Sequence, residues 1–208
     1  MLQTQAVYPD TLALLKKLVE LEELQPFVLA GGTALALQLG HRFSVDLDFF
    51  NLDDFDEEVV HKAICSLGKN ELLNKRKNSL NVILEDVKID ALRYPYPRPD
   101  AVIEIEGIRM FSPKDIAAMK LDAMSARGAK KDFYDIYFLL KMYSLREMLD
   151  FHSQKYQHTT QFHIIRSLTY FEDAELQTDP ISLEPISWAE VKTKPVSYTH
   201  LRAHETSE

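Results

Sequence analysis

The chain has 208 residues, of which 46% are hydrophobic and 27% are charged, and its formal net charge is −8. This composition is that of an ordinary globular protein with enough apolar material for a hydrophobic core. The negative charge argues against a protein that coats nucleic acid non-specifically, because such binding depends on Lys and Arg side chains. A single cysteine, Cys65, excludes a disulfide framework within one chain.

Targeting and membrane signals are missing from the sequence. The N-terminus lacks the basic and apolar regions of a signal peptide, and no run approaches the roughly 18 apolar residues that a membrane span needs. We therefore expect a cytoplasmic protein that does not enter a membrane.

The C-terminal residues Val196–Thr206 resemble, codon by codon, the translation of a transposase-type sequencing adapter. We interpret residues 196–208 as a disordered, adapter-derived artefact and exclude them from functional reasoning. His200 and His204 are accordingly not taken as a metal-binding pair. A final helix beginning near Trp188 is then expected to be cut short.

The first half of the chain alternates short helices and strands. Leucines at helical spacing and alternating polar and apolar residues separate the two kinds of element. In chain order we predict a helix over 11–19 capped by Asp10, a buried strand over 27–30, a helix over 33–39 ended by Gly40, a half-buried strand over 45–50, and an amphipathic helix over 56–67.

Strands continue to about residue 111 and then give way to helices. We predict a hairpin of strands over 80–84 and 87–92, a proline-rich loop over 94–99, a strand pair over 102–105 and 108–111, and helices from Ser112-Pro113 to about Glu175. The predicted fold class is α+β, a mixed sheet with flanking helices followed by a helical half. The expected domains are residues 1–111 and 112–195.

Three acidic residues suggest a metal site. Asp46 and Asp48 lie two residues apart on a predicted strand and share one face, while Val45, Leu47 and Phe49 are expected to pack into the core. Two carboxylates on one face repel each other unless a cation lies between them, and Mg²⁺ prefers such oxygen ligands. Asp90, on a second strand, could complete a site for two metal ions. Surface acids are the alternative interpretation of the Asp-x-Asp pair.

A glycine-rich turn precedes the acids. Gly31 and Gly32 end a buried strand, and Thr33 begins a predicted helix. Glycines let phosphates approach the backbone, and the amides at a helix N-terminus favour an anion. The Thr33 hydroxyl could cap the helix or bind a phosphate. A plain strand-to-helix turn is the alternative, but the nearby acids favour a phosphate site beside a metal site.

Gly31-Gly32-Thr33-Ala34-Leu35, followed by His41 to Phe50 with the paired acids, resembles the AbiEii/AbiGii toxin family. This family belongs to the DNA polymerase beta-like nucleotidyltransferase superfamily, so the resemblance implies that fold. It implies catalytic or metal-binding roles for Asp46, Asp48 and Asp90. Arg42 and Ser44, just before the acids, also match the family pattern and are expected to contact phosphate. The alternative for Arg42 is an ion pair with Asp46 or Asp48.

The resemblance also covers a lysine and an acidic helix in the second half. It implies catalytic roles for Lys120 and Asp135. If residues 120–135 formed one helix, Lys120, Arg127 and Lys131 would share one stripe, and these cations could hold triphosphate oxygens. Gly128 is the position at which such a helix could break. Asp132 and Asp135 could orient those cations or accept a proton. The alternative is an exposed charged helix face.

The function implied is magnesium-dependent transfer of a nucleoside monophosphate from a nucleoside triphosphate, with two Mg²⁺ ions expected. The implied acceptor is RNA, above all the tRNA 3′ end, and the implied biological role is that of a toxin in a toxin–antitoxin or abortive infection system with a cognate antitoxin. A protein or small-molecule acceptor stays open. The alternatives are a non-catalytic nucleotide- or partner-binding module of the same fold and a metal-dependent nuclease.

Overall fold

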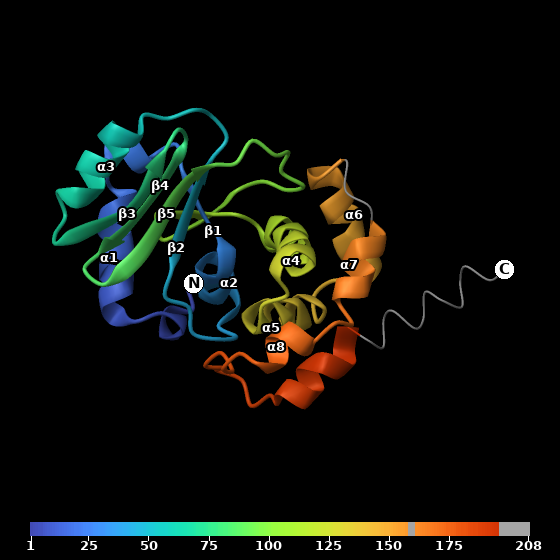
Figure 1. Ribbon diagram of the computed structural model, residues 1–208. Helices are drawn as coiled ribbons and strands as arrows, with labels where there is room; N and C mark the ends of the chain where they lie inside the picture. The colour runs from blue at the N-terminus through green and yellow to red at the C-terminus, as the bar shows by residue number, and fades with distance from the viewer. Residues whose placement is uncertain (158–160, 196–208) are drawn as a thin grey trace. The chain divides into compact units, whose positions relative to one another are not determined.

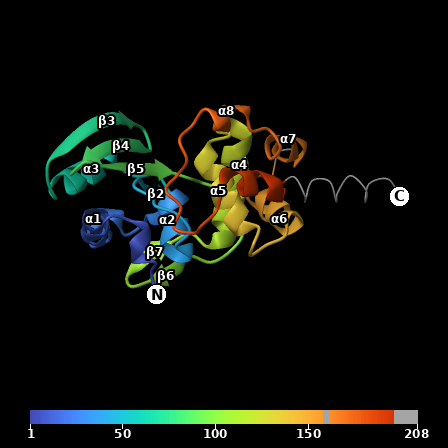
Figure 2. The same cartoon turned by 90° about the horizontal axis from the view of Figure 1, so that it is seen from below.

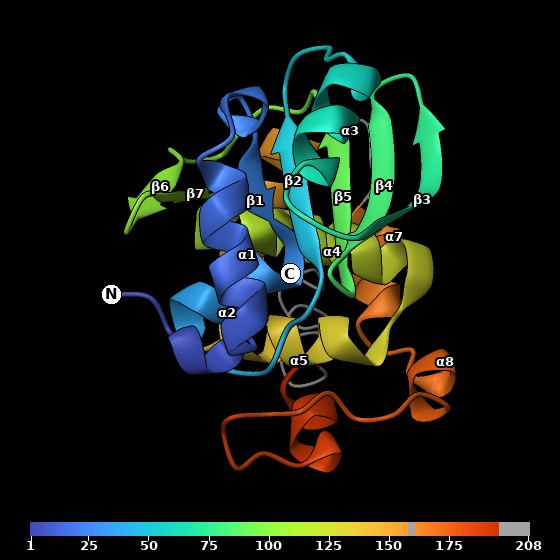
Figure 3. The ribbon, with the colours of Figure 1, turned by 90° about the vertical axis from the view of Figure 1, so that its left-hand side faces the viewer.

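A mixed β-sheet forms the core of the first part of the chain in the computed structural model, which describes residues 1–157 and 161–195 (Figure 1). Among these residues the sheet has seven strands in the order β3-β4-β5-β2-β1-β7-β6 (Figure 3). Two pairs are parallel, β2 with β5 and β1 with β7, and the remaining neighbours are antiparallel. The strands are β1 (Val28–Ala30), β2 (Leu47–Asn51), β3 (Asn70–Arg76), β4 (Ser79–Leu84), β5 (Val87–Arg93), β6 (Ile103–Ile105) and β7 (Ile108–Met110).

One face of this sheet is apolar. Leu47 and Phe49 of β2 and Ile89 of β5 are at most 1% exposed, because alternate residues of a strand point to the same side. Helices α1 (Pro9–Val19) and α3 (Glu57–Cys65) cover this face (Figure 3). The intervening residues therefore lie on the opposite face, which is where the polar side chains of β2, β4 and β5 gather.

Most predicted elements are present, with shifted ends. Helix α1 begins at Pro9, so Asp10 lies in its first turn instead of capping it. Helix α2 (Gly31–Leu39) begins two residues before the predicted start and ends, as predicted, at Gly40, whose φ of 68° is left-handed. Asp56 caps α3, its carboxylate accepting from the amides of Glu58 and Val59.

The hairpin of β4 and β5 is confirmed, and its turn residues Glu85 and Asp86 both have positive φ angles. The pair β6 and β7 is also confirmed. Strand β3 was not predicted. It is an edge strand whose first four residues are exposed, so it lacks the apolar alternation by which a half-buried strand is recognised.

The second part of the chain is helical, as predicted. The described residues form two compact units, one of residues 1–96 and 101–112 and the other of residues 97–100, 113–157 and 161–195. Within the second unit α4 contacts α5, α6 and α7 (Figure 2). Its helices are α4 (Pro113–Arg127), α5 (Lys130–Leu139), α6 (Leu145–Lys155), α7 (Gln161–Ser167) and α8 (Glu172–Glu175), and residues 188–195 are also helical.

These features confirm the predicted α+β fold class. Across residues 1–157 and 161–195, no helix combines the length and apolar character that crossing a bilayer requires. The adapter-like segment, with His200 and His204, lies outside the described residues.

Candidate active site

Two of the predicted acids are direct neighbours in the sheet. Strands β2 and β5 are parallel, and their register pairs Asp48 with Asp90. Both side chains lie on the polar face, and that of Asp90 is 15% exposed. The third acid, Asp46, is partly buried and immediately precedes β2, which begins at Leu47. The expectation that Val45 packs into the core is wrong, because Val45 lies before the strand and is 48% exposed.

A lysine contacts this acidic row. The Lys88 ammonium donates to Asp90 Oδ2 at 2.6 Å. Partial burial alone would lower the pKa of Lys88, but the hydrogen bond to Asp90 and the charges of Asp90, Asp46 and Asp48 outweigh it, so the pKa is raised above its ordinary value. All three carboxylates therefore raise the pKa of the same lysine, so they form a single negative region.

The donor atoms suit a divalent cation in their chemistry. Carboxylate oxygens from two adjacent strands are hard ligands of the kind that Mg²⁺ takes, and Lys88 shows that this region accepts a positive charge. In the part of the chain that the structure describes, no three His, Cys, Asp or Glu side chains already converge with metal-ligand spacing. The assignment of Asp46, Asp48 and Asp90 as metal ligands thus stays a prediction.

Both glycines of the turn lie close to side chains of the candidate site. Gly31 has a φ of 67°, and a Cβ built there would lie 2.0 Å from Asp48 Oδ2. A Cβ on Gly32 would lie 2.5 Å from Arg42 Nη2 and 3.2 Å from Ser44 Oγ. The first turn of α2 is thus directly beside Asp48.

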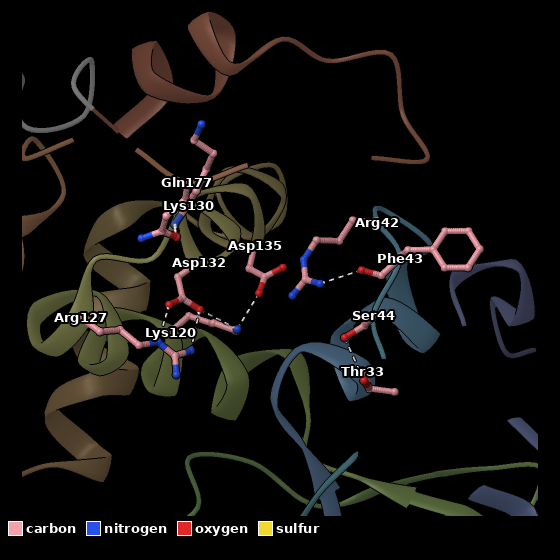
Figure 4. Close-up of polar contacts among 10 residues, drawn as sticks. All are labelled: Thr33, Arg42, Phe43, Ser44, Lys120, Arg127, Lys130, Asp132, Asp135 and Gln177. Atoms are coloured by element: carbon pink, nitrogen blue, oxygen red, sulfur yellow. Dashed lines mark hydrogen bonds and ion pairs between the residues drawn. The ribbon is translucent and has the colours of Figure 1, made fainter. Parts of the chain in front are cut away.

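Thr33 has a different contact from the one expected of a cap. Because α2 begins at Gly31, Thr33 is inside the helix and fully buried. Its hydroxyl donates to the carbonyl of Asp46, and its oxygen lies 2.9 Å from Ser44 Oγ (Figure 4). The helix-capping interpretation of Thr33 is therefore wrong. The side chain connects α2 to the segment that carries Asp46.

Arg42 is 3% exposed, and its Nη1 donates to the carbonyl of Phe43 at 2.8 Å (Figure 4). The close approach to Gly32 and the contact between Ser44 and Thr33 place Arg42 and Ser44 against the first turn of α2. The structure thus places Asp48, Arg42 and Ser44 beside the first turn of one helix. Their contacts with phosphate remain predicted.

In the second unit, a buried ion cluster joins α4 and α5. The Lys120 ammonium lies 2.9 Å from Asp132 Oδ1 and 2.6 Å from Asp135 Oδ2 (Figure 4). Arg127 donates to both oxygens of Asp132, from Nε at 2.9 Å and from Nη2 at 3.1 Å. Asp132 and Asp135 have no exposed surface, whereas the Arg127 side chain is 55% exposed.

The single-helix stripe of Lys120, Arg127 and Lys131 is wrong. Gly128 has a φ of 51° and lies between α4, which ends at Arg127, and α5, which begins at Lys130. The turn brings Asp132 back against α4 instead. Asp132 and Asp135 do contact the cations, as the sequence suggested.

The charges of this cluster shift the pKa of Asp132. Burial would raise it and the neighbouring Asp135 also raises it, but the charges of Lys120 and Arg127 and the Arg127 hydrogen bond outweigh both, and the pKa is lowered. Asp132 is therefore ionised at neutral pH and holds both cations in place.

Two polar residues at the acidic row were not identified from the sequence. Lys88 could have been found from its i, i+2 spacing to Asp90, which puts both on one strand face. Asn81 donates from Nδ2 to Asp90 Oδ1 at 2.8 Å, and only the pairing of β4 with β5 could reveal it.

Known proteins resemble this chain in sequence over most of its length. The family described as "Nucleotidyl transferase AbiEii toxin, Type IV TA system" matches residues 13–201. The uncharacterised protein aq_aa25 of Aquifex aeolicus (strain VF5) is 38% identical over 187 residues, which cover 86% of this chain and 88% of that protein. The family match thus includes the glycine turn, the acids and the buried ion cluster.

Solved structures share the fold at low sequence identity. JHP933 from Helicobacter pylori has a TM-score of 0.60 at 21% identity and covers 100% of this chain and 98% of its own. MenT4, a nucleotidyltransferase toxin from Mycobacterium tuberculosis H37Rv, has a TM-score of 0.58 at 16% identity and covers 91% of this chain and 82% of its own. These likenesses identify the nucleotidyltransferase fold.

Proposed function

The chain belongs to the AbiEii nucleotidyl transferase toxin family, and we propose that it transfers a nucleoside monophosphate from a nucleoside triphosphate to an acceptor, releasing pyrophosphate. One observation carries the proposal: the register of β2 and β5 sets Asp48 against Asp90, in a negative region that already holds the Lys88 cation. A negative region would repel the phosphates of a nucleotide unless bound cations offset its charge. The region therefore supports a site for a nucleotide together with metal ions.

Asp46, Asp48 and Asp90 are the residues that would hold Mg²⁺. When bound, the metal would offset the charge of the triphosphate and of the leaving pyrophosphate. Asp48 is held beside the first turn of α2 because Gly31 has no side chain. The backbone amides of that turn favour an anion, so they are suited to phosphate oxygens close to the acids.

The Thr33 contacts fix Asp46 relative to this turn. The hydroxyl donates to the Asp46 carbonyl and is also joined to Ser44. A side chain buried in α2 thus positions the backbone of the first acid, and Thr33 acts on the site through Asp46. In the second unit, Asp132 and Asp135 hold Lys120, and Asp132 also orients the half-exposed Arg127. Arg127 and Lys131 are the cations that we assign to the triphosphate.

The acceptor that we propose is RNA, with the tRNA 3′ end as the first substrate to test. The purified chain is incubated with total RNA, Mg²⁺ and each labelled nucleoside triphosphate in turn, beside Asp48→Asn and the matched control Asp53→Asn. Asp53 is an exposed acid five residues further along the chain. We expect label on RNA with the parent chain and Asp53→Asn, and none with Asp48→Asn.

Other results would change the assignment. Label on protein or on a small molecule would keep the transferase and replace RNA as acceptor. RNA cleavage without any nucleoside triphosphate would support a nuclease instead. Full labelling by Asp48→Asn would refute the proposed site.

The biological role that we propose is that of a toxin with a cognate antitoxin. Induced expression in a bacterial host should arrest growth, and Asp48→Asn should abolish the arrest at equal protein level. Growth arrest by the Asp48→Asn chain would separate toxicity from nucleotide transfer.

A further inference from the structure

Both carboxylate oxygens of Asp90 are held by neighbouring side chains. Asn81 donates from Nδ2 to Oδ1 at 2.8 Å, and Lys88 donates to Oδ2 at 2.6 Å. In the register of the sheet, Asp90 lies between Asp48 on β2 and Asn81 on β4. The orientation of this carboxylate is thus set partly by a residue of the next strand.

A second asparagine determines which way the Asn81 amide faces. Asn74 on β3 donates from Nδ2 to Asn81 Oδ1 at 3.0 Å. A side-chain amide has an acceptor oxygen on one side and a donor NH₂ on the other. Since Asn74 engages the oxygen, the NH₂ group of Asn81 is turned toward Asp90.

A β-bulge brings Asn74 to this place. The pairing of β3 with β4 runs in regular register from Asn70 to Leu72 and resumes at Asn74, which leaves Leu73 as an extra residue. Without a bulge, Leu72 and Asn74 would point to the same face. With it, Leu72 is paired with the core-facing Val82, while Asn74 is paired with Asn81 on the polar face.

We propose that Asn81 is the positioning residue of Asp90 and that Asn74, delivered by the bulge at Leu73, sets the direction of the Asn81 amide. The inference rests on the proposed function, because it concerns Asp90 as the third acid. Neither asparagine touches the reacting atoms in this assignment. They act through Asp90 alone, in the way that hydrogen-bond partners behind a metal ligand tune metal binding.

The test measures Mn²⁺ binding to the purified full chain without nucleotide, by electron paramagnetic resonance, with Mn²⁺ as the probe for the Mg²⁺ site. Asn81→Leu removes the donor and should weaken Mn²⁺ binding about 10-fold. Asn74→Asp replaces a donor by an acceptor, so the Asn81 amide should reverse and present its oxygen to Asp90. We expect Mn²⁺ binding to weaken here too, although an added negative charge would by itself attract a cation.

Asn70→Asp is the matched control, because it adds the same charge on an exposed residue of the same strand. It should change Mn²⁺ binding less than twofold. Thermal unfolding of each variant shows whether it is folded. If Asn81→Leu does not fold, Asn74→Asp decides: weaker Mn²⁺ binding supports the inference, and unchanged or tighter binding overturns it.

Asp90→Asn separates this inference from the proposed function. If Asp90→Asn weakens Mn²⁺ binding and stops nucleotide transfer while Asn81→Leu and Asn74→Asp behave like the parent chain, the positioning role is refuted and the proposed function stands. If Asp90→Asn itself changes neither Mn²⁺ binding nor transfer, Asp90 is not the third acid and both assignments are refuted.

Discussion

At the scale of single residues, Gly31 combines a left-handed backbone conformation with close contact to a candidate metal ligand. Its φ of 67° is left-handed, and the space that a side chain would fill is taken by the Asp48 carboxylate. Left-handed backbone costs an L-residue about 1–2 kcal/mol. Two reasons therefore favour glycine at position 31: the left-handed turn into α2 and the close approach of the Asp48 carboxylate.

Gly31→Ala should lower the free energy of unfolding and abolish nucleotide transfer, because Asp48 must move away from the new methyl group. Gly107→Ala is the matched control, since Gly107 also has a positive φ of 78° but no atom within 4 Å of its Cβ position. The control should lose about 1–2 kcal/mol of stability and keep full activity. Denaturant unfolding and the RNA-labelling assay measure both effects. Retained transfer by Gly31→Ala would argue against a functional Asp48.

The buried cluster of Lys120, Arg127, Asp132 and Asp135 predicts a pH dependence. The pKa of Asp132 in the folded chain is lowered below its ordinary value of 3.8, so the folded state binds this proton less readily than the unfolded state does. The stabilisation is therefore complete above about pH 4 and is lost as the pH falls through the lowered folded-state pKa. Asp132→Asn should remove this acid-dependent part of the unfolding free energy.

At neutral pH, Asp132→Asn should also destabilise the chain by about 3–5 kcal/mol, because Lys120 and Arg127 lose a buried charged partner. Urea unfolding between pH 3 and pH 7 measures both effects. Asp150→Asn, at an exposed position on α6, serves as control and should follow the parent curve. A parent-like curve for Asp132→Asn would mean that the cluster contributes nothing to stability.

At the scale of elements, the ends of helices and the pairing of strands decide how the site is assembled. Asp56 caps α3 through bonds of 2.9 Å and 3.2 Å to the amides of Glu58 and Val59. Gly128 ends α4 and lets α5 return its acids to Lys120. The sequence marked Gly128 as a possible break in the helix and Asp132 as a partner of the cations, whereas the return of α5 against α4 became visible only in the structure.

Asp56→Ala should destabilise the chain by about 1 kcal/mol, because two amides at the start of α3 lose their acceptor. The midpoint of urea unfolding measures this change. Asp53→Ala, at an exposed acid three residues earlier, should shift the midpoint by less than half as much. Equal shifts would show that general charge, and not capping, is responsible.

Strand β3 shows where element prediction failed. Leu72 and Leu73 stand side by side, and charged residues follow, so neither helical nor strand periodicity is visible. The strand forms because β4 offers it a partner, and the bulge at Leu73 interrupts its alternation. Pairing across the sheet therefore overrides local pattern at this edge.

At the scale of the whole molecule, the net charge limits how the proposed RNA acceptor would bind. The net charge is −8, so the chain as a whole offers little of the counterion release that drives non-specific RNA binding. RNA recognition would depend on a few local cations and on the metal–nucleotide complex.

Without nucleotide and Mg²⁺, total RNA should therefore bind weakly, with a Kd no tighter than about 10⁻⁶ M at physiological salt. Filter binding over a salt series measures the Kd and its salt dependence. A small basic protein that binds RNA tightly is measured in parallel and shows that the assay detects tight binding. Nanomolar binding by this chain would show that charge distribution, and not net charge, governs its association with RNA.

The sequence by itself determined the α+β class, the chain order of most elements, and the residue types of the site. The alternation of Leu47, Asp48 and Phe49 and the Gly31-Gly32 turn are local patterns, and local patterns fix which face a side chain takes and where the chain turns. At Val45 and Asp46 the alternation failed, because the strand begins only at Leu47. Recognition of the family rested on the same short segments.

Only the tertiary structure decided which residues became neighbours. The register of β2, β5 and β4 set Asp48, Asp90 and Asn81 in one row, and the bulge in β3 added Asn74. The turn at Gly128 gave two helices in place of one, and it decided the direction in which α5 returns against α4. The physical reason is that periodicity within a segment carries no information about which other segment will pair with it, since that depends on the packing of the whole chain.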